Sequence, residues 1–268
     1  MFYYSEKKNW WSRSGVPENM PIGEPGGPDT EMFWDFGAER GLHERSVWKD
    51  EPCHPNCDCG RFIEIGNNVF MEYQKTENGF AKLAQQNVDF GGGLERLASA
   101  LTDEPDMFRN DLFTPLLTWL EGLAKTTYGK DEEKIYAFRV LLDHLRASVF
   151  LISDGVQPSN TDQGYVLRRL LRRAVRVADQ FGLPQDSLRG AARAIAKSYA
   201  ESYPELSKKE AEIARVLSEE EQKFRRTLER GLKELEKRFA KGPLSGQDAF
   251  DLFTTYGFSY RTDRGDCE

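Results

Sequence analysis

The chain has 268 residues, of which 39% are hydrophobic, so it can bury a core and is not disordered throughout. Its 37 Lys and Arg against 44 Asp and Glu give a net charge of −7, which excludes a uniformly basic nucleic-acid binder. Any nucleic-acid contact therefore needs a local basic surface. No apolar run approaches the roughly 20 residues of a membrane helix, and the first residues lack the apolar core of a signal peptide, so we expect a cytoplasmic protein.

The first half of the chain alternates turns with strand-like segments. Gly and Pro recur through residues 15–31, which predicts a loop. Residues 31–37 predict a strand, and residues 62–74, rich in Ile, Val, Phe and Tyr, predict a central strand of an antiparallel sheet. Residues 87–101 predict a strand that ends in glycines, followed by a helix from about Leu94.

The second half has apolar residues at helical spacing. The predicted helices cover residues 111–125, 133–155, 163–181 and 205–241. The change of pattern near residue 125 predicts an α+β protein of two domains, 1–125 and 126–245, with 246–268 as the end of the second domain.

A glycine-rich segment, Val88–Arg96, joins the last predicted strand to its helix. Glycines let a backbone approach a ligand closely, and an arginine in the first helical turn can bind a phosphate through two N–H groups. Arg96 is therefore a candidate phosphate ligand. A glycine-rich turn with an ordinary surface arginine is the alternative.

A basic helix is the second candidate site. Five arginines lie one, three or four residues apart, and the leucines between them supply a buried face: Arg168, Arg169, Arg172, Arg173 and Arg176. On an acidic protein this pattern indicates a surface that follows a phosphate backbone. The alternative is a solvated face paired with the acidic helix predicted at residues 205–241.

Three of the four cysteines, Cys53, Cys57 and Cys59, are crowded into one short segment. This spacing does not resemble a disulfide framework. The cysteines can ligate a structural Zn²⁺ if His54 or His43 completes a tetrahedral set. A reduced turn without metal is the alternative.

The glycine-rich segment resembles motif 3 of the class II aminoacyl-tRNA synthetases, and the aspartate before its glycines resembles that of the alanyl enzymes (motif 3 at 88–97). The resemblance implies that Arg96 binds the γ-phosphate of ATP and that Asp89 holds the amino group of alanine. We assign both residues to catalysis. It also implies that the backbone at Gly91 and Gly93 contacts ATP, with Gly91 beside alanine as well.

Other segments resemble the same family in the same order. Asn9-Trp10-Trp11 resembles its Asn-Phe-Trp, which places Trp11 in the alanine pocket. Residues 26–31 resemble its Gly-Pro-Cys-Gly-Pro loop followed by an acidic strand. Residues 62–67 resemble its E-I-W-N strand, which places Asn67 against alanine. The chain departs from the family at Gly66, where a Trp is usual, and at Gly26, where a Cys is common.

The basic helix and the segment before it resemble the family's tRNA-recognition domain. Asp143-His144-Leu145-Arg146 and residues 159–169 resemble D-H-I-R and S-N-x-G-R-G-Y-V-L-R-R, and Gln163 stands where the family has an Arg. The resemblance implies that Asn160 recognises the G·U pair of the tRNA-Ala acceptor stem in the minor groove, where an amide can both donate and accept. The arginines would hold the phosphates.

The resemblance thus implies an alanine–tRNA ligase that uses ATP and Mg²⁺. It also implies a partial class II antiparallel sheet followed by an α-helical tRNA-recognition domain. Glu64 and Glu72 are weak candidates for Mg²⁺ ligands. Motifs 1 and 2 and the editing domain have no match in the chain, so we expect it not to charge tRNA by itself. The alternatives are a non-catalytic module that binds the acceptor stem, and one part of a split enzyme completed by a separate chain with motifs 1 and 2.

The last residues depart from the family. Residues 252–258 resemble its L-Y-D-T-Y-G-F, with Thr254 in place of an acidic residue that helps to recognise the G·U pair. Residues 261–267 equal an out-of-frame translation of the family's E-L-T-E-E-I-A, so we interpret the tail as frameshifted. Because Thr254 replaces that acidic residue, we expect less strict recognition of the G·U pair.

Overall fold

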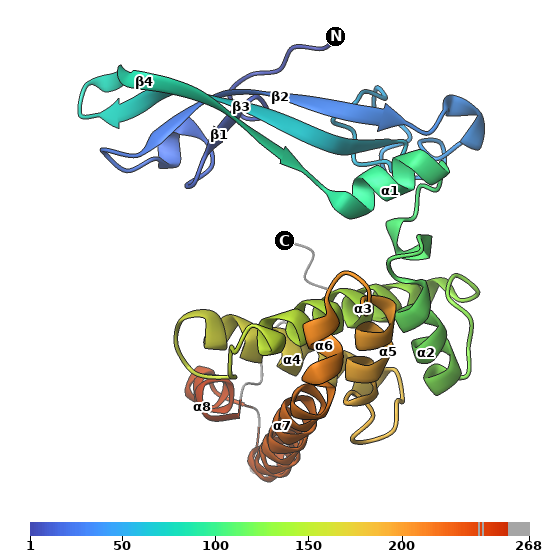
Figure 1. The fold of residues 1–268 in the computed structure, drawn as a ribbon. Coiled ribbons are helices and arrows are strands. Elements are labelled where there is room, and N and C mark those ends of the chain that lie inside the picture. Colours follow the sequence, from blue (N-terminus) through green and yellow to red (C-terminus); the bar gives the residue numbers. More distant parts are fainter. Residues whose placement is uncertain (241, 243, 257–268) are drawn as a thin grey trace. The chain divides into compact units, whose positions relative to one another are not determined.

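The structure is a computed structural model that describes residues 1–240, 242 and 244–256, without the side chains at 253, 254 and 256. It divides into two compact units, one spanning Met1–Leu112 and one from Phe113 onward. The first is built on an antiparallel sheet and the second on helices, so the expected α+β fold is confirmed (Figure 1).

The sheet of the first unit has four strands in the order β1-β2-β3-β4, each antiparallel to its neighbour. Their bounds are β1 Trp10–Ser12, β2 Pro25–Asp35, β3 Phe62–Thr76 and β4 Gly79–Gly92. The segment predicted at residues 62–74 is indeed central, since β3 pairs with β2 on one side and with β4 on the other.

Strand β2 begins earlier than predicted, because residues 25–31 belong to the ladder rather than to a loop. The glycines that suggested a turn are required here for close strand contact. A Cβ on Gly27 would lie 1.7 Å from the backbone oxygen of Phe70 on β3. Gly27 therefore allows the backbones of β2 and β3 to approach closely, which is one of the roles of glycine within a strand.

The rest of the first unit connects the strands. Helix α1 (Leu94–Thr102) begins at the predicted residue, directly after β4. Short 3-10 turns lie at η1 Pro17–Asn19, η2 Ala38–Arg40 and η3 Met107–Arg109. The long connection between β2 and β3, residues 36–61, has η2 as its one regular element among the described residues.

The second unit has seven helices among the residues that the structure describes. They are α2 Thr114–Ala124, α3 Glu132–Ser153, α4 Asp162–Gln180, α5 Gly190–Ser198, α6 Pro204–Lys208, α7 Glu210–Phe239 and α8 Gly246–Tyr256. The helix predicted at 205–241 is interrupted at Lys209, and α5 was not predicted.

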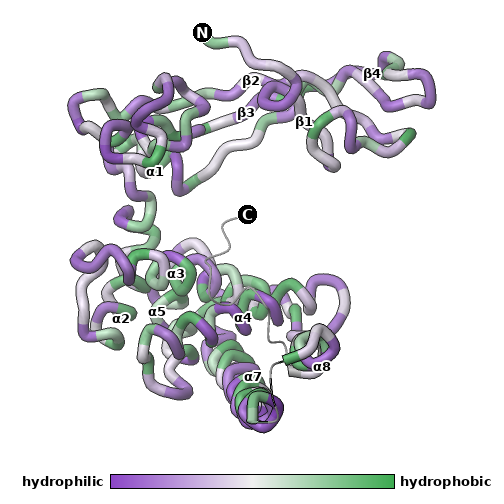
Figure 2. The backbone as a smooth tube through the Cα atoms, turned by 180° about the vertical axis from the view of Figure 1, so that it is seen from behind, coloured by the Kyte–Doolittle hydropathy of each residue, from purple (hydrophilic) through white to green (hydrophobic). Residues whose placement is uncertain are grey.

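The core of this unit lies between α3, α4, α5 and α7, which pack on one another. Leu145 and Val149 of α3 and Leu167 and Leu171 of α4 are fully or almost fully buried. Figure 2 shows hydrophobic and hydrophilic residues alternating along α7, as expected for a helix with one buried stripe.

The units divide at Leu112 and Phe113, whereas the change in sequence pattern suggested residue 125. Helix α2, which lies before residue 125, packs against α3 and α5. Its contacts therefore place it with the helical unit.

Two predictions concern residues outside the description. The side chain of Thr254 and the tail at 261–267 are not among the described parts of the chain. Among the helices described, none combines the length and apolar character needed to cross a membrane.

Candidate functional site

One face of the sheet gathers the polar residues that the sequence singled out. Asn67 on β3 pairs with Gly91 on β4 and with Glu31 on β2. Val69 pairs with Asp89 and Asp29 in the same way. Because directly paired residues point to the same side of a sheet, Asp29, Glu31, Asn67 and Asp89 share one face, which we call the acidic face.

A β-bulge adds Glu64 to the acidic face. Glu64 and Asn67 are three residues apart and would point to opposite faces of a regular strand. The pairing shifts between Met32 and Phe33 of β2, so that Glu64 pairs with Phe33. Bulges re-aim side chains in this way, often beside active sites.

The bulged carboxylate binds the arginine of the glycine-rich segment. Arg96 Nη1 donates to Glu64 Oε2 at 2.8 Å and lies 3.3 Å from the Glu64 carbonyl oxygen. A Cβ on Gly93 would press on the Arg96 side chain at 3.1 Å, whereas one on Gly91 would meet nothing within 4 Å. The absence of a Cβ at Gly93 thus leaves room for the Arg96 side chain, and the space beside the backbone of Gly91 is open.

Several buried oxygens on the acidic face lack a hydrogen-bond donor among the described residues: Asp29 Oδ1, Glu31 Oε2 and Asn67 Oδ1. Asp29 is 7% exposed and accepts from Asn67 Nδ2 at 2.9 Å. Burial raises the pKa of both Asp29 and Glu31, and the neighbouring Glu64 carboxylate raises them further. A buried acceptor without a donor is costly, so this face is suited to a ligand that carries N–H groups or positive charge.

A pocket of about 430 Å³ opens over part of this face. Its floor includes Asp29, Glu31 and Phe33, and residues 1–4 form one wall. Pro55 and Asn56, from the connection between β2 and β3, also line the pocket. Burial raises the pKa of Glu31, and a side-chain hydrogen bond from Asn56 offsets part of this rise.

The predicted Trp11 lies on β1 opposite Gly27 and is 43% exposed. The pairing of β2 with β3 shifts register between Gly26 and Asp29, beside this position. Trp10, the neighbour of Trp11, stacks on Tyr73.

The departure at Gly66 is explained by packing on the opposite face. A Cβ there would lie 2.8 Å from the ring of Phe90 and 2.9 Å from Cε of Met32. These two side chains fill the volume that a larger residue would take.

The two weak candidates for metal ligands differ in their surroundings. Glu64 lies on the acidic face beside Arg96. Glu72 forms an ion pair with Lys82 at 2.9 Å, which lowers the pKa of Glu72. Only Glu64 therefore lies near the other predicted site residues.

The basic helix α4 divides its arginines into two groups. Arg168 and Arg172 form ion pairs with the buried Glu220 of α7, at 3.3 and 3.4 Å. Arg169 and Arg173 are exposed and form no ion pair among the described residues, although Arg173 donates to the hydroxyl of Tyr136. Arg176 is half-buried, and desolvation lowers its pKa. Pairing with the acidic helix, the alternative to a phosphate-binding surface, thus applies to Arg168 and Arg172.

The predicted Asn160 lies on an exposed loop that Arg168 supports. Arg168 Nη1 donates to Asn160 Oδ1, and Nη2 donates to the carbonyl of Pro158 at 2.9 Å. A Cβ on Gly164, at the start of α4, would collide with Ser159 of this loop. The loop therefore rests directly on the first turn of α4.

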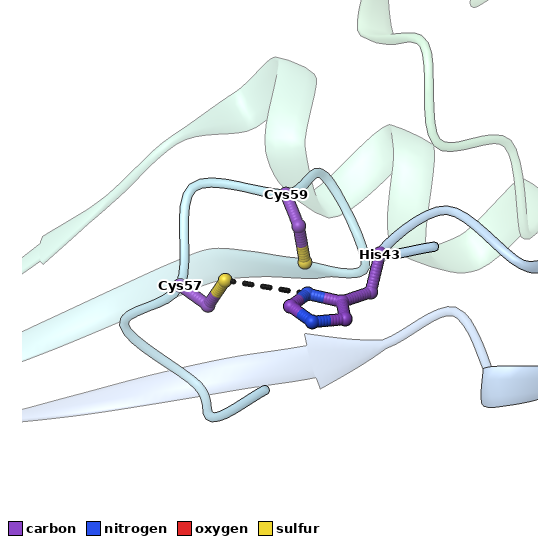
Figure 3. A group of neighbouring side chains, drawn as sticks. All are labelled: His43, Cys57 and Cys59. Atoms are coloured by element: carbon purple, nitrogen blue, oxygen red, sulfur yellow. Dashed lines mark hydrogen bonds between the residues drawn. The ribbon is translucent and has the colours of Figure 1, made fainter. Parts of the chain in front are cut away.

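His43, Cys57 and Cys59 come together with Cys53 beside Cys59, and we call these four residues the thiol cluster. The ligand atoms of His43, Cys57 and Cys59 lie within 4.8 Å of one another, as Figure 3 shows for these side chains. Cys57 Sγ is 3.6 Å from His43 Nδ1, and Cys53 Sγ is 4.0 Å from Cys59 Sγ. The other predicted fourth ligand, His54, hydrogen-bonds the hydroxyl of Tyr4 through Nδ1.

Asp29 and Glu31 are candidate site residues that the sequence interpretation missed. The signal was an Asp and a Glu two residues apart, the spacing of one strand face. It was hidden because residues 15–31 were interpreted as a loop.

Comparison with known proteins gives the family. Residues 1–263 match the model described as tRNA synthetases class II (A). The chain is 38% identical over 266 residues to the alanine–tRNA ligase of Bacillus subtilis (strain 168), covering 93% of this chain and 30% of that protein. It is 41% identical over 254 residues to that of Thermotoga petrophila, covering 94% and 28%. The chain spans about three tenths of the length of these relatives, and it belongs to the alanyl-tRNA synthetase family of class II.

Proposed function

We propose that this chain carries part of the alanine- and ATP-binding site and the acceptor-stem surface of an alanine–tRNA ligase. The relatives are named for that reaction. The observation that supports the proposal best is the bulge in β3, which brings the Glu64–Arg96 pair to the same face as Asn67 and Asp89.

In this proposal the alanine ammonium lies between Asp89 and Asn67. An ammonium has three donors and no acceptor, and the buried Oδ1 of Asn67 lacks a donor among the described residues. The carboxylate of Asp89 offsets the charge. Trp11 borders the small side chain, and the absence of a Cβ at Gly91 leaves space beside it.

Arg96 is proposed to bind the γ-phosphate of ATP, with the backbone of Gly91 and Gly93 against the nucleotide. Mg²⁺, when bound, would supply positive charge to the phosphates, and we assign Glu64 as the carboxylate that would hold it. Arg96 then exchanges its contact with Glu64 for one with phosphate. Activation needs positioning and charge stabilisation rather than a side-chain nucleophile. A structural zinc ion is a further cofactor that we propose, with ligands from the thiol cluster.

On the helical unit, Asn160 is proposed to recognise the acceptor stem of tRNA-Ala in the minor groove. Arg169 and Arg173 are the exposed arginines proposed to contact phosphates, with Arg176 beside them. Arg168 and Arg172 are bound by Glu220, so we assign Arg168 to holding the Asn160 loop, and Arg172 contributes less to phosphate binding.

Two binding measurements on the chain test the proposal. A non-hydrolysable analogue of alanyl-adenylate should bind in calorimetry, and Asp89→Asn should weaken it about 10- to 100-fold, the effect of losing a charged hydrogen bond. Glu77→Gln removes the same charge from the exposed β3–β4 turn and is the matched control. Equal effects of the two variants would contradict the assignment of Asp89.

A hairpin RNA with the acceptor stem of tRNA-Ala should bind more tightly than the same hairpin with G·C in place of G·U. RNA binding without analogue binding would favour a non-catalytic module instead. Alanine-dependent pyrophosphate exchange is expected only after mixing with a segment that carries motifs 1 and 2. Exchange by the chain alone would show that those motifs are not needed.

A further inference from the structure

The thiol cluster lies in the long connection between β2 and β3, residues 36–61. Connections of more than about 12–15 residues with little regular structure are uncommon in compact domains. This one is nevertheless well buried at His43, Cys57 and Cys59. Few large apolar side chains of the connection are buried, so apolar packing contributes little to holding it.

Two of the distances within the cluster match those of a tetrahedral zinc site. Zn–S bonds of about 2.3 Å and Zn–N bonds of about 2.0–2.1 Å at tetrahedral angles separate two sulfurs by about 3.8 Å and a sulfur from a nitrogen by about 3.6 Å. The Cys53–Cys59 sulfurs are 4.0 Å apart, and Cys57 Sγ lies 3.6 Å from His43 Nδ1. All three cysteines are free thiols.

His43 is oriented as a metal-binding histidine. Its Nε2 lies 3.0 Å from the carbonyl oxygen of Glu51 and donates to it, which leaves Nδ1 as the unprotonated nitrogen that faces the thiols. Zinc-binding histidines are held in this way by a carbonyl or carboxylate on their second nitrogen. His54 uses its Nδ1 for Tyr4, which favours His43 as the fourth ligand.

The guanidinium of Arg61, which is shared with Asp35, lies beside the charge that such a site would carry. Three thiolates and a neutral imidazole around Zn²⁺ leave a net charge of −1. Arg61 Nη1 lies 4.0 Å from Cys53 Sγ, and the same guanidinium is held by the carboxylate of Asp35 through two contacts of 2.7 and 2.8 Å.

We propose that His43, Cys53, Cys57 and Cys59 bind one Zn²⁺ in a closed, structural site. The ion joins the two ends of the connection between β2 and β3. Pro55 and Asn56, which line the pocket over the acidic face, lie between two of its ligands. Zinc therefore holds one wall of that pocket. The inference is independent of the proposed aminoacylation function, because it rests on the geometry of the cluster alone.

Metal content tests the proposal without any substrate. The chain, purified under reducing conditions, should contain about one zinc ion per molecule by mass spectrometry of the metal. Replacement by Co²⁺ should give the visible bands of a tetrahedral ion and the near-ultraviolet bands of thiolate coordination. Absence of both results, or a Cys53–Cys59 disulfide in that material, would overturn it.

Variants identify the ligands. His43→Gln and Cys57→Ser should each lower the zinc content at least tenfold, whereas His54→Gln and Cys267→Ser should leave it unchanged. Cys53→Ser should keep a weaker site whose cobalt spectrum shows one thiolate fewer. If a variant fails to fold, the cobalt spectrum of the unmodified chain still decides. Equal zinc content in His43→Gln and His54→Gln would exclude the proposed ligand set.

Discussion

The division of arginines on α4 gives a quantitative prediction for RNA binding. Each phosphate contact contributes about 0.7–0.9 to the slope of log affinity against log salt, because it releases counterions. Arg169 and Arg173 are exposed, while Arg172 is half-buried, bound to Glu220 at 3.4 Å and placed 5.1 Å over the ring of Phe224. Arg169→Ala and Arg173→Ala should therefore each reduce the slope by about 0.8, and Arg172→Ala should barely change it.

The assay is fluorescence anisotropy of a labelled acceptor-stem hairpin, titrated with each variant between about 50 and 200 mM KCl. A slope change of about 0.8 over this fourfold range makes the salt-induced loss of affinity about threefold smaller than for the unmodified chain. All three variants lose one positive charge, so Arg172→Ala controls for net charge, and circular dichroism controls for folding. Equal slope changes in Arg172→Ala and Arg169→Ala would refute the reasoning.

Three further predictions concern stability and are checked by urea unfolding. Glu221→Ala should lower the free energy of unfolding by about 3–5 kcal/mol, because this 1% exposed carboxylate accepts from two backbone N–H groups and an arginine. The control Glu219→Ala, at an exposed position on the same helix, should lower it by less than about 0.5 kcal/mol. Glu31→Gln should stabilise the chain at neutral pH, but not below pH 4.5, the ordinary pKa of a glutamate. Burial raises the pKa of Glu31 in the folded chain, so its ionisation destabilises the fold only as the pH rises through that raised pKa. An equal gain at both pH values would contradict this. Gly27→Ala should cost about 3 kcal/mol or more, since its Cβ would lie 1.7 Å from a backbone oxygen of β3, and Gly91→Ala, which meets nothing within 4 Å, should not.

The sequence predicted the elements whose pattern is local. Residues 62–74 combine β-branched and aromatic residues in a way that only a strand explains, and α4 has an apolar stripe that predicts a helix directly. The start of β2 was missed because the glycine and proline residues at 25–28 have the same composition in a turn and in a tightly paired strand.

Some residues of the candidate site were predictable, whereas Asp29, Glu31 and the geometry of the site were not. Asn67, Asp89 and Arg96 were found from motifs, yet the bulge that turns Glu64 toward Arg96 depends on the register with β2. Likewise, that Arg172 is bound by Glu220 follows from the packing of α4 on α7, which lie far apart in the sequence. Pairings of this kind are decided by tertiary structure.

Arg168 contacts both the Asn160 loop and α7, and this has a consequence for natural variation and for engineering. Its guanidinium holds the Asn160 loop on one side and contacts Glu220 of α7 on the other. A change in α7, which itself need not touch RNA, can therefore alter the angle at which the amide is presented. A search for variants with altered base-pair preference should randomise position 220 together with position 160.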